Sequence, residues 1–217
     1  MNAIIFGAPG SGKGTYSSRL RDILGVEVIS MGDIFRAMLK KDSELGRTVK
    51  GYVEAGLLVP DNIVLQVLKE SIKKAPKGKG FILDGYPRTL AQAEALEKIA
   101  KINVIIRLAV PDWIIVERLS SRRICKDCGT VYNLRFLKPK KDNVCDKCGG
   151  QLYRRSDDNP EVIQMRLDLY ERETDPLIRY YKAKKVPIIE HVAKSLDMPP
   201  DKVVEQIIGD LKNLKLV

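Results

Sequence analysis

The chain has 217 residues, of which 44% are apolar and 30% are charged. This composition indicates a soluble globular domain, or one domain with insertions, and excludes a disordered chain. No apolar run reaches the roughly 18 residues of a membrane span, and the first residues lack a secretory signal, so we expect a cytoplasmic protein with no membrane partner. The formal net charge of +10 favours anionic partners: nucleic acid, acidic lipid or phosphorylated small molecules.

Five short apolar runs alternate with helical patterns along the chain. The runs predict strands over residues 3–6, 26–29, 81–83, 104–108 and 186–189. A helix is expected after the first strand, and further helical patterns cover 61–75, 89–100, 111–121, 160–184 and 199–213. Alternation of this kind predicts an α/β fold with a parallel sheet.

Two segments interrupt the alternation and predict the domain organisation. Residues 30–59 have helical patterns without a strand, and residues 122–158 carry all four cysteines. We expect a core formed by residues 1–29, 60–121 and 159–217, from which these two segments are insertions. Between Arg118 and Arg155, eleven basic and three acidic residues give a local charge of +8, so the anion is expected near the second insertion.

A glycine-rich loop follows the first strand and opens a helix. Its sequence, Gly7-Ala8-Pro9-Gly10-Ser11-Gly12-Lys13, fits the first seven positions of the phosphate-binding pattern G-x-x-x-x-G-K-[ST]. Glycines let several backbone N–H groups point at one phosphate, while the helix N-terminus and Lys13 add positive charge. The eighth position is Gly14, and the hydroxyl stands one position later at Thr15. The alternative, a glycine-rich turn with an exposed lysine, suits this strand–loop–helix context poorly.

A second motif, Asp84-Gly85-Tyr86-Pro87-Arg88, ends the third predicted strand, and Gln92 follows it. In a P-loop protein a carboxylate at this place typically lies near the magnesium ion or its waters. Together with the loop at residues 7–15, whose GKGT variant is usual there, this motif resembles the nucleoside monophosphate kinases, and best the adenylate kinase family. The resemblance covers essentially the whole chain, including both insertions.

The resemblance implies a P-loop three-layer fold with a five-stranded parallel sheet, a helical AMP-binding insertion at 30–59 and a zinc-bearing lid at 122–158. It implies an enzyme that transfers a phosphoryl group reversibly from MgATP to AMP, giving two ADP. One alternative is a kinase for another nucleoside monophosphate, although UMP/CMP-type relatives usually carry Asn where this chain has Gln92. The other is a P-loop protein whose basic zinc ribbon binds nucleic acid. We expect ATP, AMP and ADP as partners, no nucleic acid, and a monomer.

The resemblance also implies the site residues, position by position. ATP is expected at Gly10, Ser11, Gly12, Lys13, Gly14, Thr15, Arg118, Arg122, Val131 and Tyr132. AMP is expected at Met31, Arg36, Leu57, Leu58, Val59, Gly85, Tyr86, Arg88, Gln92, Arg155 and Arg166. The catalytic set is Lys13, Asp84, Arg88, Arg122, Arg155 and Arg166. Phosphoryl transfer needs in-line placement and positive charge, and the planar fork of arginine grips phosphate oxygens in pairs.

Four positions depart from the family pattern. Met31 stands where Thr is usual in the AMP segment, Tyr16 replaces a Gln behind the glycine-rich loop, Val131 stands where Thr is common, and Ser121 replaces a frequent Gly at the lid hinge. No general base is required, because the acceptor is already an anionic phosphate, so we expect the lone His191 to be structural.

The four cysteines form two C-x2-C pairs, Cys125 with Cys128 and Cys145 with Cys148, separated by sixteen residues. In a chain without an export signal this spacing predicts a metal site. Four thiolates leave no open position and therefore predict a structural zinc ion, which would order a segment with few apolar residues. Iron in a rubredoxin-like site and reversible disulfides are the alternatives. The glycines after the pairs suit tight turns.

Overall fold

A five-stranded sheet forms the centre of the computed structural model, which describes residues 1–39, 43–76, 78–196 and 198–217. The strands are β1 (Asn2–Gly7), β2 (Glu27–Ser30), β3 (Phe81–Asp84), β4 (Val104–Ala109) and β8 (Ile188–Val192). They lie in the order β2-β3-β1-β4-β8, and every pairing is parallel. The predicted α/β fold with a five-stranded parallel sheet is confirmed, although the last strand begins two residues later than expected.

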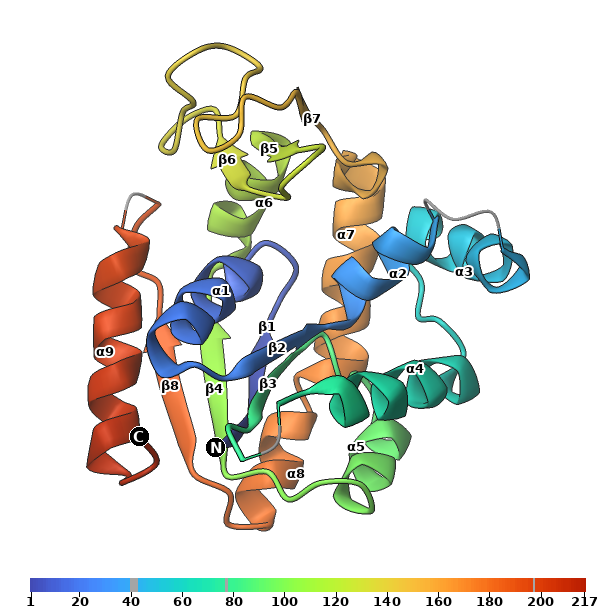
Figure 1. Cartoon of the computed structure of the whole chain (residues 1–217), viewed down its shortest axis with the longest axis vertical. Helices are drawn as coiled ribbons and strands as arrows, with labels where there is room; N and C mark the ends of the chain where they lie inside the picture. The colour runs from blue at the N-terminus through green and yellow to red at the C-terminus, as the bar shows by residue number, and fades with distance from the viewer. Residues whose placement is uncertain (40–42, 77, 197) are drawn as a thin grey trace.

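Helices cover both faces of the sheet (Figure 1). Helices α1 (Lys13–Leu24) and α9 (Pro200–Asn213) pack on one face, which includes Ala3 and Ile5 of β1. Helices α4 (Asp61–Lys74), α5 (Leu90–Glu97) and α8 (Leu177–Ala183) pack on the other, which includes Ile4 and Phe6. Successive side chains of a strand point to opposite faces, so the continuous apolar run of β1 is buried on both. Among the residues that the structure describes, no helix is long and apolar enough to cross a membrane.

The predicted helical stretch over residues 160–184 is not one helix. Helix α7 (Pro160–Leu169) continues into the π-helical turn η2 (Tyr170–Thr174), and α8 begins only at Leu177. Pro176 separates the last two elements, because proline lacks the N–H that a continuing helix would need. The expectation is therefore corrected to three consecutive elements.

The segment at residues 30–59 is helical beyond the end of β2. It contains α2 (Met31–Leu39) and α3 (Glu44–Ala55), while residues 40–42 lie outside the described part of the chain. Ser43 caps α3 by accepting a hydrogen bond from the Gly46 N–H at 3.0 Å, and Gly56 ends it with a φ of 72°. In Figure 1 α2 stands beside α7, and its buried Met31 and Phe35 pack into the core next to the sheet.

Residues 122–158, the cysteine lobe, follow α6 (Asp112–Ser120) and stand above the sheet in Figure 1. The lobe holds a three-stranded antiparallel sheet, with β5 (Arg122–Cys125) between β6 (Val131–Asn133) and β7 (Leu152–Tyr153), and ends in the 3-10 turn η1 (Ser156–Asp158). Its buried apolar cluster consists only of Cys125, Tyr132, Cys145 and Leu152. The sequence did not predict these strands, because they lack the continuous apolar runs of the central sheet.

Candidate active site and metal centre

The glycine-rich loop connects β1 to α1 and leaves no room for side chains at two positions. Gly10 and Gly12 have φ angles of 82° and 103°, in the region that favours glycine. A Cβ at Gly10 would lie 2.8 Å from Leu119, and a Cβ at Gly12 would lie 2.8 Å from the ring of Tyr16. Tyr16 is buried behind the loop, so this departure from the family pattern supports the loop without lining the phosphate side. The tight backbone can therefore approach a phosphate closely.

Lys13 folds its side chain back over this loop. Its Nζ donates hydrogen bonds to the carbonyl oxygens of Gly7, at 2.6 Å, and Ala8, at 3.0 Å. Burial lowers the pKa of Lys13 to about 8; the nearby Asp84 opposes this shift and Arg88 adds to it. A charge in this position would be stabilised strongly by an incoming phosphate.

Five arginines from different parts of the chain gather near Lys13, three of them beside it and the other two beside those three. They are Arg36 of α2, Arg88 after β3, Arg122 of β5, Arg155 before η1 and Arg166 of α7. Burial lowers the pKa of both Arg88 and Arg155 to about 10, and repulsion from the other arginines adds to the shift. Burial and mutual repulsion both show that these cations are crowded together.

Aspartates hold the arginines in place but do not neutralise the site. The pairs are Arg36 with Asp33 at 2.6 Å, Arg122 with Asp158 and Arg166 with Asp157 at 2.9 Å, and Arg155 lies 3.8 Å from Asp33. With Asp84, four carboxylates face six cations, which leaves an excess charge of +2. Asp157 and Asp158 were not predicted from the sequence, although two adjacent acids beside a strongly basic segment could have drawn attention to them.

Asp84 lies at the end of β3 with 8% of its surface exposed. Burial raises the pKa of Asp84, the charge of Lys13 opposes that shift, and Asp33 repels it further. The Asp84 carboxylate at the end of β3, beside the phosphate-binding loop, offers the oxygen ligands that Mg²⁺, a hard cation, takes. The residues present therefore fit a magnesium ion carried by a nucleotide.

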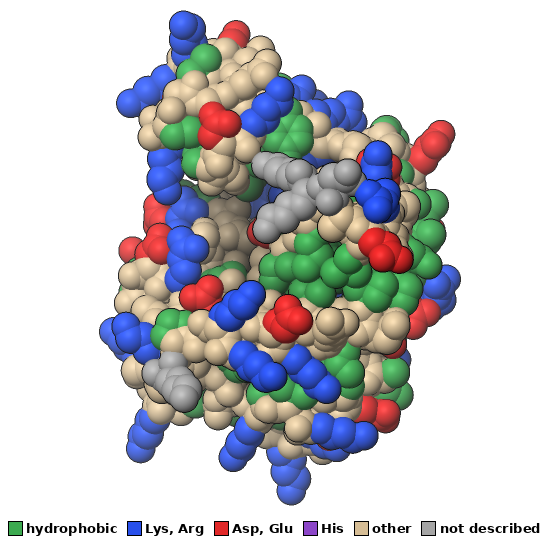
Figure 2. Space-filling view, turned by 45° about the vertical axis from the view of Figure 1, so that its right-hand side comes forward, with side chains coloured by type: hydrophobic (Ala, Val, Ile, Leu, Met, Phe, Trp, Pro, Cys, Tyr) green, Lys and Arg blue, Asp and Glu red, His purple; other side chains and the backbone are tan. Residues whose placement is uncertain are grey.

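A cavity lies between the insertion at residues 30–59 and the loop after β3. It holds about 590 Å³ of empty space, part of it open to solvent. Its lining includes most residues expected at AMP: Met31, Arg36, Leu57, Leu58, Val59, Gly85, Arg88, Gln92 and Arg166. Tyr86 and Arg155 are not on this wall; Tyr86 is buried behind it, with its hydroxyl donating to the Gln92 carbonyl at 3.0 Å. Figure 2 shows the surface hollowed between the cysteine lobe at the top and the rest of the molecule.

The residues expected at ATP are only partly brought together. Arg118 donates to the Ser11 carbonyl at 3.3 Å and so contacts the glycine-rich loop. The ring of Tyr132, however, is buried inside the cysteine lobe, where its hydroxyl donates to Cys145 Sγ at 3.4 Å and accepts from the Asp146 N–H at 2.7 Å. The ring packs with Cys125, Cys145 and Leu152 in the buried cluster of the lobe. Val131 is half-buried on β6.

The junction between α6 and the cysteine lobe is held by two polar side chains. Ser121 Oγ lies 2.5 Å from the Glu117 carbonyl oxygen and 3.1 Å from Asn133 Oδ1. Asn133 is buried and donates to the Arg118 carbonyl at 3.1 Å. These bonds link the lobe to the helix that carries Arg118.

His191 is half-buried on β8, and burial lowers its pKa, which favours the neutral imidazole.

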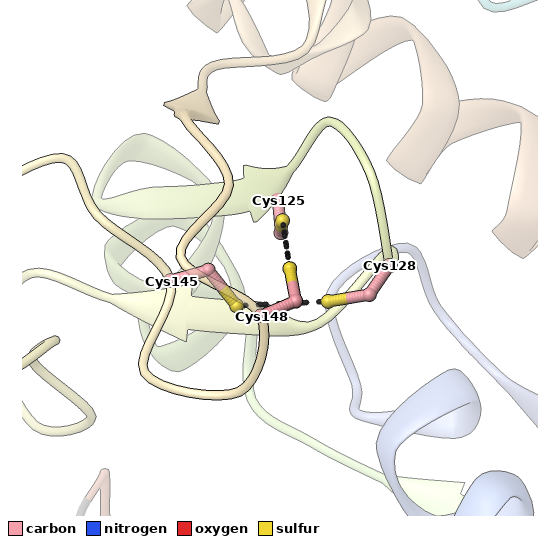
Figure 3. A group of neighbouring side chains, drawn as sticks. All are labelled: Cys125, Cys128, Cys145 and Cys148. Atoms are coloured by element: carbon pink, nitrogen blue, oxygen red, sulfur yellow. Dashed lines mark hydrogen bonds between the residues drawn. The ribbon is translucent and has the colours of Figure 1, made fainter.

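The four cysteine sulfurs converge on one point, as Figure 3 shows. All lie within 4.8 Å of one another, with Cys125 and Cys148 Sγ at 3.4 Å and Cys128 and Cys145 Sγ at 3.6 Å. These separations far exceed the roughly 2.05 Å of a disulfide. They approach the roughly 3.8 Å between thiolates around a tetrahedral zinc ion. The cysteines therefore fit a metal ion closed on all four sides.

Tight turns bring each cysteine pair to this centre. Gly129 and Gly149 have φ angles of 72° and 76°, and their N–H groups donate to the carbonyls of Cys125, at 3.1 Å, and Cys145, at 2.8 Å. At Gly150 a Cβ would lie 2.9 Å from Cys125 Sγ, so space rather than φ requires glycine there.

Comparison with known proteins agrees with this arrangement. The family model described as "Adenylate kinase" matches residues 5–186. Adenylate kinase from Methanosarcina acetivorans is 47% identical over 91% of this chain and 94% of its own length. The adenylate kinase of Caldicellulosiruptor saccharolyticus is 49% identical over 85% of this chain and 88% of its own. That of Bacillus licheniformis is 41% identical over 99% of this chain and 97% of its own.

Proposed function

Because the chain belongs to the adenylate kinase family and transfers a phosphoryl group between ATP and AMP, we propose how its residues divide that work. The single observation that carries the proposal is the excess of positive charge around the glycine-rich loop, where six cations face four carboxylates. Two nucleotides bring the phosphate charge that would balance it. The enzyme binds ATP, AMP and ADP.

The glycine-rich loop and Lys13 are proposed to hold the ATP phosphates. Backbone N–H groups at residues 10–15 would point at the phosphates, and Lys13 would leave the carbonyls of Gly7 and Ala8 to reach the outer ones. Arg118 would lie beside the donor nucleotide because it already contacts the loop. Magnesium bound with ATP supplies further charge neutralisation, and Asp84 would hold it or its waters.

The cavity between the insertion at residues 30–59 and the loop after β3 is proposed to hold AMP. Leu57, Leu58 and Val59 would face the base and ribose, Gln92 the adenine edge, and Arg36 and Arg88 the phosphate. An oxygen of the AMP phosphate then attacks the γ-phosphorus of ATP, and the bond from that phosphorus to the β–γ bridging oxygen breaks, which leaves two ADP. Arg122, Arg155 and Arg166 would stabilise the charge on the transferred oxygens, and no proton needs to move.

We further propose the division into a core of residues 1–29, 60–121 and 159–217, an AMP-binding segment at 30–59 and a lid at 122–158. The lid carries Arg122 and Arg155 at its two ends, so its movement as one body would deliver both to the phosphates. Zinc is the ion proposed for the four cysteines, with a structural role, because no open ligand position remains. Free thiols suit a reducing compartment, so a cytoplasmic location is part of the proposal. A monomer is proposed from the family resemblance alone.

Steady-state kinetics of single variants test this assignment. Lys13→Met and Arg88→Ala should each lower kcat/KM by at least about a hundredfold while circular dichroism stays unchanged, because each removes charge from a water-poor site. Arg179→Ala, at an exposed position of α8, is the control and should leave the kinetics within about twofold. Near-normal turnover in Arg88→Ala would contradict the proposed roles.

A further inference from the structure

Both ends of the Gln92 amide are already bonded within the protein. Its Oε1 accepts a hydrogen bond from the Arg88 backbone N–H at 2.8 Å, and its Nε2 donates to Asp61 Oδ1 at 2.6 Å. Gln92 itself is 3% exposed and lies on the wall of the AMP cavity. Asp61 is the first residue of α4 and is exposed to solvent. A partner from 31 residues away therefore holds this buried amide.

These two partners fix which end of the amide is oxygen and which is nitrogen. A carboxylate can only accept a hydrogen bond and a backbone N–H can only donate one, so a flipped amide would lose both bonds. Each end of Gln92 retains one further capacity: a second lone pair on Oε1 and a second hydrogen on Nε2. The amide can thus offer one acceptor and one donor, in a fixed order, to a ligand in the cavity.

This order matches adenine and opposes guanine. The adenine edge presents the N6 amino donor next to a ring-nitrogen acceptor, whereas the matching edge of guanine presents the O6 acceptor next to a protonated ring nitrogen. We propose that Asp61 is a positioning residue for base choice: it fixes the Gln92 amide in the orientation that accepts adenine and rejects guanine. The inference rests on the proposed role of Gln92 at the AMP base.

The bond to Arg88 extends the consequence from the base to the phosphate. Gln92 Oε1 holds the backbone of the same residue whose guanidinium faces the AMP phosphate, and the Arg88 carbonyl accepts from Thr174 at 3.0 Å. An amide released from Asp61 could rotate away from Arg88 as well. Loss of Asp61 is therefore expected to raise the AMP KM in addition to relaxing base choice.

A different role for Asp61 would be electrostatic. A negative charge in the first turn stabilises a helix, whatever the side chain contacts. Two substitutions separate the roles. Asp61→Asn removes the charge but keeps an oxygen that can accept from Gln92, whereas Asp61→Ala removes both. Asp112 provides the matched control, since it also stands first in its helix, α6, directly after a proline.

The experiment measures kcat and KM with AMP and with GMP, and the melting temperature, for Asp61→Asn, Asp61→Ala, Gln92→Ala, Asp112→Asn and Asp112→Ala. Asp61→Ala should raise the AMP KM about fivefold and lower the preference for AMP over GMP by a similar factor, with kcat within about twofold. Asp61→Asn should stay near the parent enzyme in both, and the Asp112 variants should change neither.

Two results would overturn the inference. Suppose that Asp61→Ala keeps the parent AMP KM and base preference, while Gln92→Ala raises the KM and weakens the preference. Asp61 then does not position the amide, although the proposed AMP site stands. The inference also fails if Asp61→Asn and Asp61→Ala lower the melting temperature and raise the AMP KM by equal amounts. That result would assign the effect to the charge at the start of the helix. If Gln92→Ala itself leaves KM and base preference unchanged, the proposed role of Gln92 fails together with the inference.

Discussion

The guanidinium of Arg122 grips both oxygens of the Asp158 carboxylate. Its Nε donates to Oδ2 at 2.8 Å, and a second N–H bonds Oδ1, while the Asp158 side chain is 0% exposed and that of Arg122 is 14% exposed. The pair joins the first strand of the cysteine lobe to its last turn. A carboxylate thus holds a proposed catalytic arginine in a fixed place, where a phosphate could compete for it.

Removal of the Asp158 charge is expected to destabilise the fold. Asp158→Asn leaves the partly buried Arg122 without a counter-charge in a site that already has excess positive charge, so the free energy of unfolding should fall by about 3 kcal/mol. Asp201→Asn is the control, because that side chain is 76% exposed in its pair with Arg19 and should cost less than about 1 kcal/mol. Urea unfolding measures both. Equal losses would show that burial does not govern the Arg122 pair.

Lys13 gives the stability of the enzyme a defined pH dependence. Its folded pKa of about 8 is below its ordinary value of 10.5, so between these pH values the unfolded chain binds more protons than the folded one. The contribution of Lys13 to stability should therefore rise as the pH increases from about 8 to about 10. In denaturant unfolding, the free energy of unfolding of the parent minus that of Lys13→Met should increase as the pH rises from about 8 to about 10. Lys74→Met, at an exposed lysine of α4, should show no such change, and a flat difference for Lys13→Met would contradict the account.

The metal should stabilise the fold of the cysteine lobe and take no part in phosphoryl transfer. Cys145→Ser, or treatment with a chelator, should expose residues 122–158 to proteolysis and lower thermal tolerance, because the lobe has only a four-residue buried cluster of its own. Some turnover should persist at low temperature. Chelator added to Cys145→Ser should have no further effect and serves as the control. Protein purified under reducing conditions without zinc or iron, or activity lost while the lobe stays protected, would contradict a structural metal.

Met31 is expected to serve packing more than recognition. It is 2% exposed and belongs both to the core cluster and to the cavity wall, where a methionine can make no strong hydrogen bond. Met31→Thr should lower the free energy of unfolding by about 2 kcal/mol while the AMP KM stays equal or falls. Met165→Thr, at an exposed site on α7, should cost less than about 0.5 kcal/mol. A much higher AMP KM in Met31→Thr would show a direct role for the methionine.

Local patterns predicted the features that depend on neighbouring residues. A few consecutive residues define each of three features: the loop at residues 7–15, each of the five strands, and each cysteine pair. The arginines were predicted from the family resemblance. The partnerships of Asp61 with Gln92 and of Asp158 with Arg122 span 31 and 36 residues, and no local spacing signals them. The resemblance placed Tyr132 near ATP, but the burial of its ring beside Cys145 depends on contacts across the lobe that the sequence does not reveal. Long-range packing thus determined the features that the sequence did not reveal.

The most direct test of the account is the rate of ADP formation from ATP with each nucleoside monophosphate, with and without magnesium. AMP should be the preferred acceptor by a wide margin, the reaction should run in reverse from ADP, and removal of magnesium should abolish it. Equal turnover with CMP or GMP would contradict the assignment of the cavity to AMP, and full activity without magnesium would contradict the proposed role of Asp84.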